Sequence, residues 1–252
     1  MRPSDNARRA ADRVRHHLRR PLARTPYVWD LAMWLRPEKR QTLAGRHTAL
    51  VIDGFLRSGN TFSVAAFVVA NGADLHLGRH LHGGPHLLRA ARLQVPAVLL
   101  IRRPSDAVAS YLVRRPTLTV RDALLEYLDT YRTAWRARDD FVVATFDQVV
   151  DDFGAVIERV NSRFGTGFVR YRPTEENEAA AFALVEEMNR RECRGEVVET
   201  HVGRPSPARE GGKARVRADL AHPDAQRLLA EAEELYARYA SLAGEATRNG
   251  YP

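Results

Sequence analysis

The stretch TALVIDGFLRSGNTF (residues 48–62) decides the fold class of this chain. Its first six residues (48–53) form an apolar, β-rich run that is typical of a buried strand. A glycine loop follows. The next run (60–72) lacks strand alternation and ends at an Asn-Gly pair, a stop signal for a helix. A strand, a glycine loop and a helix in this order predict an anion site made from backbone N–H groups.

The glycine loop departs at one position from the motif G-x-x-x-x-G-K-[ST] of nucleotide triphosphatases. Gly54, Gly59 and Thr61 satisfy that motif, but Asn60 stands in place of its lysine. The backbone can still bind phosphate, whereas the charge that serves a transferring γ-phosphoryl group is missing. Arg57 adds a permanently charged fork of donors inside the loop. We therefore expect phosphate binding without metal-assisted ATP hydrolysis.

Strand and helix patterns alternate along the rest of the chain. Two further buried strands are predicted at 95–103 and 141–146. The predicted helices span residues 104–115, 119–138, 151–164, 176–191 and 223–242. Residues 73–94 are histidine-rich and less regular, and a loop rich in Gly, Pro and Arg is expected at 201–217. The alternation predicts an α/β fold with a parallel sheet covered on both faces.

Composition narrows the classes of protein to which the chain can belong. It has 252 residues, 44% of them hydrophobic, and the single Cys193 fits a reducing compartment. The net charge is +8, but lysine occurs only at Lys39 and Lys213, and the arginines are scattered. We therefore expect no nucleic-acid partner. No apolar run approaches the ~18 residues of a membrane span and no secretory signal is present, so a cytoplasmic location is expected.

The N-terminus differs in character from the remainder. Residues 1–46 are expected to form a basic helical extension, and residues 47–252 a single α/β domain. Arginines surround a narrow apolar stripe, and Trp29 and Trp34 follow it. Residues 5–36 could therefore make weak contact with a membrane surface, placing the protein peripherally at the inner membrane face. The alternative is an ordinary helix that packs on the core, which the narrow, alanine-rich stripe favours.

A second stretch, LLIRRPSDAVASYL (99–112), extends the anion site. It places Arg102 at the C-terminal end of a strand and Ser110 about two turns into the next helix. Ligands of open α/β sheets bind at the carboxyl ends of the strands. Arg102 and Ser110 could therefore hold a second phosphate, and a nucleotide with phosphates at two positions would fit.

These two stretches, in this order and at this spacing, resemble the sulfotransferases that use 3′-phosphoadenosine 5′-phosphosulfate. The family's 5′-phosphosulfate loop reads Pro-Lys-Ser-Gly-Thr-Thr-Trp, or Arg-Ser-Gly-Ser-Ser-Phe in carbohydrate-acting branches. Its 3′-phosphate segment reads Arg-(Asn/Asp)-Pro-x-Asp-x-x-x-Ser. The resemblance covers residues 48–165 and implies a three-layer α/β/α fold of the phosphate-loop NTPase type with a central parallel sheet. Arg103 departs from the pattern, because the family has a neutral or acidic residue there.

The resemblance also implies roles for individual residues. Arg57 would stabilise the bridging oxygen as the bisphosphate nucleotide leaves, and no metal would take part. The hydroxyls of Ser58 and Thr61, with the backbone of the loop, would hold the 5′-phosphate. A basic-glycine segment near the C-terminus would close over the nucleotide. The expected nucleotide-binding residues are Arg57, Ser58, Gly59, Asn60, Thr61, Phe62, Arg102, Ser110, Arg209, Gly212 and Lys213.

The acceptor hydroxyl needs a general base, and histidine suits this role near neutral pH. Similarity of LHGGPHLL (81–88) to the family's THLPPELL implies His82 as the base, with His80 as the runner-up. His76 and His86 complete two pairs spaced four apart, a spacing that also suits zinc. Glycines and a proline interrupt any helix there and no carboxylate or cysteine completes the set nearby, so no metal site is expected.

The function expected from this resemblance is sulfuryl transfer to an acceptor hydroxyl. The acceptor would be a carbohydrate or a small molecule, and Arg57 favours a sugar because carbohydrate branches carry arginine there. Two other classes stay open: a small-molecule kinase or NTPase on the same fold, and a catalytically degenerate protein that binds glycans or a membrane surface.

Overall fold

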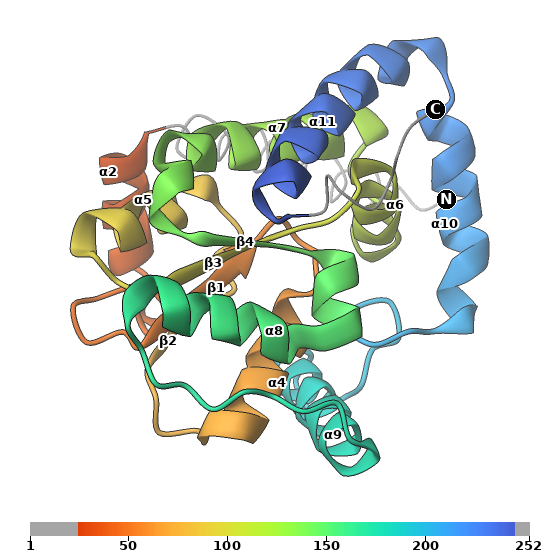
Figure 1. The fold of residues 1–252 in the computed structure, drawn as a ribbon. Coiled ribbons are helices and arrows are strands. Elements are labelled where there is room, and N and C mark those ends of the chain that lie inside the picture. The colour runs from red at the N-terminus through yellow and green to blue at the C-terminus, as the bar shows by residue number, and fades with distance from the viewer. Residues whose placement is uncertain (1–24, 245–252) are drawn as a thin grey trace.

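A computed structural model describes residues 25–244 and contains one four-stranded sheet within that range. The strands are β1 (Leu50–Gly54), β2 (Leu77–Arg79), β3 (Ala97–Ile101) and β4 (Val142–Thr145). All three neighbouring pairs are parallel, and the order across the sheet is β2-β1-β3-β4 (Figure 1). The predicted α/β fold with a central parallel sheet is confirmed.

Helices cover both faces of this sheet, as Figure 1 shows. On one face lie α5 (Gly84–Leu93), α6 (Pro104–Arg114), α7 (Val120–Ala134) and α11 (Pro223–Leu242). On the other lie α4 (Asn60–Asn71) and α8 (Phe146–Phe164). Two outer helices complete the architecture: α9 (Glu175–Glu192) packs on α4, and α10 (Glu210–Leu220) packs on α6. The result is the three-layer arrangement expected from the sequence.

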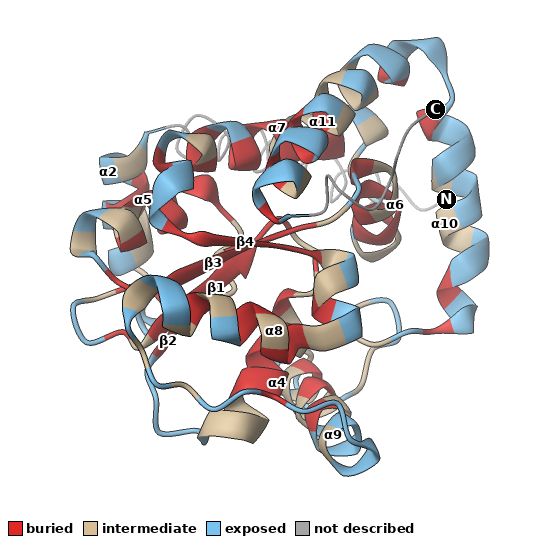
Figure 2. Cartoon of the chain, in the orientation of Figure 1, coloured by how far each residue is buried: buried red, intermediate tan, exposed pale blue. Residues whose placement is uncertain are grey.

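The core forms because successive side chains of each strand point to opposite faces. In β3, Leu99 packs with α5, α6 and α7, whereas Leu100 packs with α4 and α8. Both residues are fully buried, and the central strands are buried along their whole length (Figure 2). This explains the continuous apolar runs in the sequence, which parallel sheets require.

Three predicted boundaries differ from the structure. Residues 73–94, expected to be irregular, contain the short edge strand β2 and helix α5, which starts at Gly84 with Pro85 in its first turn. Helix α8 begins earlier than predicted because Thr145 caps it and forms a capping box with Gln148. The predicted helix from 119 ends at Ala134 and continues as the 3-10 turn η1 (Trp135–Asp140).

The predicted loop at 201–217 is wrong over its second half. It contains a 3-10 turn, η2 (Pro207–Arg209), and most of helix α10. Glycine has low helix propensity, but a Cβ at Gly212 would lie 3.0 Å from Val113 of α6. The glycine therefore lets the two helices approach closely, and packing overrides propensity.

The N-terminal part of the described chain is tied to the sheet. Helix α2 (Pro26–Trp34) packs on α5, and a short helix α3 (Pro37–Arg40) follows. The Arg79 N–H of β2 donates to the Thr42 carbonyl at 3.0 Å. The basic helical pattern predicted before residue 25 lies outside the described residues. Within residues 25–244, no helix has both the length and the apolar character needed to cross a bilayer.

Candidate functional site

The phosphate loop connects β1 to α4 at the carboxyl end of the sheet. Gly54 is needed at its start, because a Cβ there would lie 2.1 Å from the Leu100 carbonyl oxygen of β3. Gly59 ends the loop with φ of +93°, a conformation that glycine adopts without strain. Arg57 has φ of +69° despite its side chain. Such strain is stored where the surrounding structure fixes it, and it often marks a functional site.

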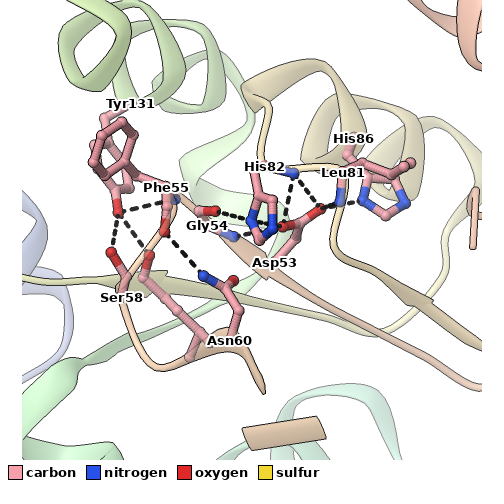
Figure 3. Close-up of polar contacts among 10 residues, drawn as sticks. Asp53, Gly54, Phe55, Ser58, Asn60, Leu81, His82, His86 and Tyr131 are labelled. Carbon is pink, nitrogen blue, oxygen red and sulfur yellow. Dashed lines mark hydrogen bonds and ion pairs between the residues drawn. The ribbon is translucent and has the colours of Figure 1, made fainter. Parts of the chain in front are cut away.

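The side chains of Tyr131 and Asn60 hold the loop through hydrogen bonds (Figure 3). The Tyr131 hydroxyl donates to the Leu100 carbonyl at 2.8 Å, so it must accept from the Phe55 N–H and from the Ser58 hydroxyl, both at 3.3 Å. The amide of Asn60 donates to the Phe55 carbonyl at 2.9 Å. In place of the lysine, Asn60 therefore braces the loop from within.

This bracing bears on two expected phosphate contacts. Ser58 is fully buried, its hydroxyl contacts that of Tyr131, and its N–H donates to the Phe55 carbonyl at 3.3 Å, so this residue helps to hold the shape of the loop. Thr61 lines the cavity above the loop, as does Phe62. The Ser58 hydroxyl thus has a structural partner, and its expected contact with phosphate, like that of Thr61, stays a prediction.

A strongly basic cavity of about 310 Å³ opens over the loop. Its lining includes Gly59, Asn60, Thr61, Phe62 and Ser110, with six cationic side chains: Arg57, Arg102, Arg114, Arg204, Arg209 and Lys213. Within the described residues Glu210 is the only carboxylate of this lining, and it pairs with Lys213 at 2.6 Å. Such an excess of cations suits a ligand with several negative charges.

All three nitrogens of the Arg57 guanidinium donate hydrogen bonds to protein oxygens. Its Nε donates to the Ser110 hydroxyl oxygen at 2.9 Å, and its two Nη atoms donate to the carbonyls of His201 and Val202 at 3.0 and 3.2 Å. Arg209 also donates to Val202, at 2.7 Å. The segment around 201–202 therefore presents carbonyl oxygens to arginines that a bound anion would also attract.

Burial, together with the neighbouring charges of Arg209, Arg114 and Arg102, lowers the pKa of Arg57 to about 9. Burial likewise lowers the pKa of Arg102 and of Arg209. Like charges crowded in a partly buried site raise the energy of the protein, and an anion would relieve this repulsion. The electrostatics therefore favour anion binding.

Arg102 and Ser110 lie where the second stretch predicts them, beside the loop. One Nη of Arg102 donates to the Arg57 carbonyl at 3.2 Å, and its guanidinium carbon lies 3.9 Å from the centre of the Phe146 ring. Ser110 is bridged to the loop by Arg57. The two sequence motifs thus form one continuous site.

His82 lines the same cavity, whereas His80 is not among its lining residues. The Nδ1 atom of His82 lies 3.1 Å from the Gly54 carbonyl oxygen, which can only accept, so Nδ1 carries the proton of the neutral ring. Nε2 is then the basic nitrogen. Burial lowers the pKa of His82, while Asp53 opposes that shift, so the ring is neutral at pH 7. Burial also lowers the pKa of His80, to about 3.

A buried pair fixes the loop that carries His82 (Figure 3). The Nδ1 of His86 lies 2.6 Å from Asp53, and the Nε2 of His86 accepts from the Ala44 N–H at 3.1 Å. Since Nε2 is an acceptor, Nδ1 donates to the carboxylate. Asp53 also accepts from the N–H groups of Leu81 and His82 at 3.1 Å. His82 is thereby held at φ of +54°.

Sequence reasoning missed the role of this pair. Asp53 ends the first strand, at the position where sheet sites form, and that placement was the available signal. Burial alone would raise the pKa of Asp53, but the hydrogen bond from His86 and the other polar groups around the carboxylate outweigh it, so the pKa is lowered and the group is ionised. His86, which follows His82 at a spacing of four, is fully buried.

Other expected residues fall into two groups. Arg209 and Lys213 lie in the cavity, but Gly212 lines a separate hollow between α6 and α10. Arg114, which sequence reasoning did not select, lies in the cavity one helical turn after Ser110. Its spacing of four residues from Ser110 was the signal that could have identified it.

No cluster of three potential metal ligands occurs within residues 25–244. His76, one of the four clustered histidines, instead contacts the Thr48 hydroxyl at 2.9 Å and the Gln41 carbonyl at 3.1 Å.

Comparisons with known proteins assign no family to this chain, so the function is argued from the geometry of the site. A scan against protein-family models found no match, and a search of curated proteins found none either.

Proposed function

We propose that this protein is a sulfotransferase that moves a sulfuryl group from 3′-phosphoadenosine 5′-phosphosulfate to a hydroxyl group. The observation that carries the proposal is the convergence of the phosphate loop, the Arg102–Ser110 motif and a neutral histidine on one basic cavity. A nucleotide with phosphates at both ends of its ribose matches the two adjacent anion-binding elements.

The donor nucleotide would be held by backbone and side-chain groups already on the cavity wall. The N–H groups of residues 58–61, at the start of α4, would bind the 5′-phosphate. Arg102 and Ser110 would bind the 3′-phosphate, and Arg209 and Lys213 would close the site from α10 and the turn before it. A charged phosphate is a stronger acceptor than a carbonyl. Arg57 would therefore exchange its carbonyl partners for the ligand.

The donor supplies an activated sulfuryl group, and the residues supply position, charge and a base. The acceptor oxygen forms a bond to sulfur while the bond from sulfur to the 5′-phosphate oxygen breaks, and the electron pair stays on that oxygen. Arg57 stabilises the charge that develops there. The hydroxyl proton passes to Nε2 of His82, whose lowered pKa keeps it free to accept. The acceptor would be a carbohydrate or small-molecule hydroxyl.

A thermal-shift titration tests the donor site. The protein is titrated with adenosine 3′,5′-bisphosphate and, separately, with ADP plus magnesium. A ligand present at about 100 times its dissociation constant adds about 2.7 kcal/mol of stability. We expect stabilisation by the bisphosphate alone. Stabilisation by ADP-magnesium alone would replace the proposal with a kinase or NTPase, and no shift with either would refute a nucleotide enzyme.

A matched pair of variants sharpens this titration. Ser110→Ala should weaken binding of the 3′,5′-bisphosphate but scarcely change binding of 5′-AMP, because only the former carries the 3′-phosphate. Ser162→Ala, an exposed position on α8, should leave both unchanged. Equal weakening of both nucleotides by Ser110→Ala would argue against a separate 3′-phosphate position.

A further inference from the structure

Helix α2 presents an unusual concentration of exposed apolar side chains. Nine large hydrophobic side chains are exposed in residues 25–244, and five of them lie on this nine-residue helix and its C-cap. They are Tyr27, Val28, Leu31, Trp34 and Leu35, with exposed fractions from 47% to 74%. Their spacing places them along one side of the helix. A contiguous exposed apolar patch of this kind marks an interaction surface.

The opposite side of α2 is already committed to the domain. Trp29 is buried, and a Cβ at Gly83 would lie 3.4 Å from its ring. Asp30 is also buried and forms ion pairs with Arg89 and Arg92 of α5. The helix is therefore anchored through one face and cannot turn its exposed side chains inward.

Cationic side chains border the apolar face. The Arg40 guanidinium lies 4.7 Å from the centre of the Trp34 ring, and that of Arg92 lies 4.6 Å from the centre of the Tyr27 ring. Arg36 and Lys39 follow directly after the helix. Aromatic rings beside arginine and lysine are the composition that suits the interface between lipid headgroups and acyl chains.

The charge of the whole chain is concentrated in this region. Residues 1–46 contain twelve Arg and Lys against four Asp and Glu, a net charge of +8. Residues 47–252 contain 27 of each kind, so their net charge is zero. Residues 1–24 hold +6 of this excess and residues 25–46 the remaining +2, although α2 itself contains no Arg or Lys. An anionic surface would therefore be attracted to this end of the chain.

We propose that the exposed face of α2 docks on an anionic lipid membrane surface. The exposed aromatic and aliphatic side chains of α2 leave water only if they enter an apolar phase. Each cation near anionic headgroups adds to the attraction. A nucleic acid would satisfy the charges but leave the apolar face in water. The proposal does not depend on sulfuryl transfer.

Docking in this orientation has a geometric consequence for the site. Trp29 lies on the inner side of α2 and contacts Gly83, which directly follows His82. The loop that carries the proposed base therefore lies about one helix diameter, roughly 10 Å, from the docked face.

Vesicle co-sedimentation with the full chain tests the proposal. Phosphatidylcholine vesicles are compared with vesicles that also contain phosphatidylglycerol, at low and at high salt. We expect binding only to the anionic vesicles, weakened by salt because screening shortens the reach of the charges. Leu31→Glu should reduce binding by at least about tenfold, because a charged side chain replaces an apolar one that would be buried in the membrane interface. Val169→Glu, at an equally exposed position far along the chain, should bind as the parent does.

Each other outcome overturns the proposal. Equal binding to neutral vesicles, or undiminished binding by Leu31→Glu, would exclude this face and its charge as the determinants. A dimer that dissociates in Leu31→Glu would identify a second copy of the chain as the occupant. Loss of vesicle binding on removing residues 1–24, with Leu31→Glu unaffected, would place the contact elsewhere. Thermal midpoints of Leu31→Glu and of Leu31→Ser show whether lost binding reflects unfolding.

Discussion

At the scale of single residues, the backbone conformation of His82 determines what its ring can do. A side chain at φ of +54° is strained, and the two carboxylate contacts from Asp53 to residues 81 and 82 hold it there. The Gly54 carbonyl then fixes the tautomer. Asp53 and Gly54, at the end of β1, thus fix both the backbone and the ring of His82. This makes His82 a better candidate for a base than His80.

Substitution of the two histidines separates them. His82→Ala should lower sulfuryl transfer by about 100-fold to 10,000-fold, the usual contribution of a general base, whereas His80→Ala should retain activity. Because the pKa of His82 lies below its ordinary value of 6.5, the parent rate should stay level down to that pH and fall only below it. Initial rates across pH measure the loss of rate in each variant and the acid limb of the parent's profile. Binding of adenosine 3′,5′-bisphosphate shows that each variant is folded. Loss of activity in His80→Ala alone would reverse the assignment.

We expect Asp53 to act as a positioning residue, since it contacts the backbone of His82, the proposed base, rather than a reacting atom. Asp53→Asn places an amide where two N–H donors now meet a carboxylate oxygen, so the loop shifts. We expect turnover to fall about 100-fold, the effect of a small misplacement, while the Michaelis constant for the donor changes little. Removing the negative charge should also move the acid limb of the profile to lower pH, because Asp53 raises the pKa of His82.

The exposed Asp74→Asn serves as the control for this change of charge. A loss of stability in Asp53→Asn with turnover and pH profile unaltered would mean that Asp53 is purely structural. Steady-state rates and a urea unfolding curve distinguish the two roles.

At the scale of elements, the phosphate loop depends on how closely β1 approaches β3. The loop can begin at residue 54 only because no Cβ stands between these strands. Tyr131 of α7 and Asn60 of α4 then tie the loop to the layers on both faces of the sheet. The geometry of the anion site is therefore a property of four elements together.

Gly54→Ala tests this close approach. The new methyl would overlap a backbone carbonyl that cannot rotate away, so we expect a loss of about 1–3 kcal/mol of stability and weaker bisphosphate binding. Gly45→Ala is a matched control, because no atom lies within 4 Å of a Cβ built there. Urea unfolding of both variants gives the comparison. Equal stability of the two would contradict the close packing of the strands at this point.

At the scale of the whole molecule, two distinct surfaces carry the proposals. The neutral α/β body gathers arginines from the phosphate loop, α6 and the segment before α10 around one cavity. The N-terminal part exposes apolar side chains on α2, beside the cationic Arg40 of α3. The loop at 80–83 lies between them, because it is anchored to β1 on one side and to Trp29 on the other.

The sequence by itself determined the order of strand, glycine loop and helix, and hence the fold class. These features follow from local patterns: apolar runs for buried strands, glycine spacing for the loop, and Arg102 at a strand end. Ser110 of α6 and the cavity residues at the start of α4 also lie where those patterns place them. The short strand β2 escaped because three residues carry too little periodicity. Helix α10 escaped because glycine has low helix propensity, and the packing of Gly212 on α6 is not visible in the sequence.

Only the tertiary structure decided which atoms of these residues face the site. Ser58 turns its hydroxyl to Tyr131, 73 residues away, and Arg57 meets carbonyls 144 and 145 residues away. Asp53 joins His86 and the His82 loop across about thirty positions of sequence. A periodic pattern reports which face of an element is buried, but not which distant partner it meets. That choice is made when the layers pack and every buried polar group must find a partner.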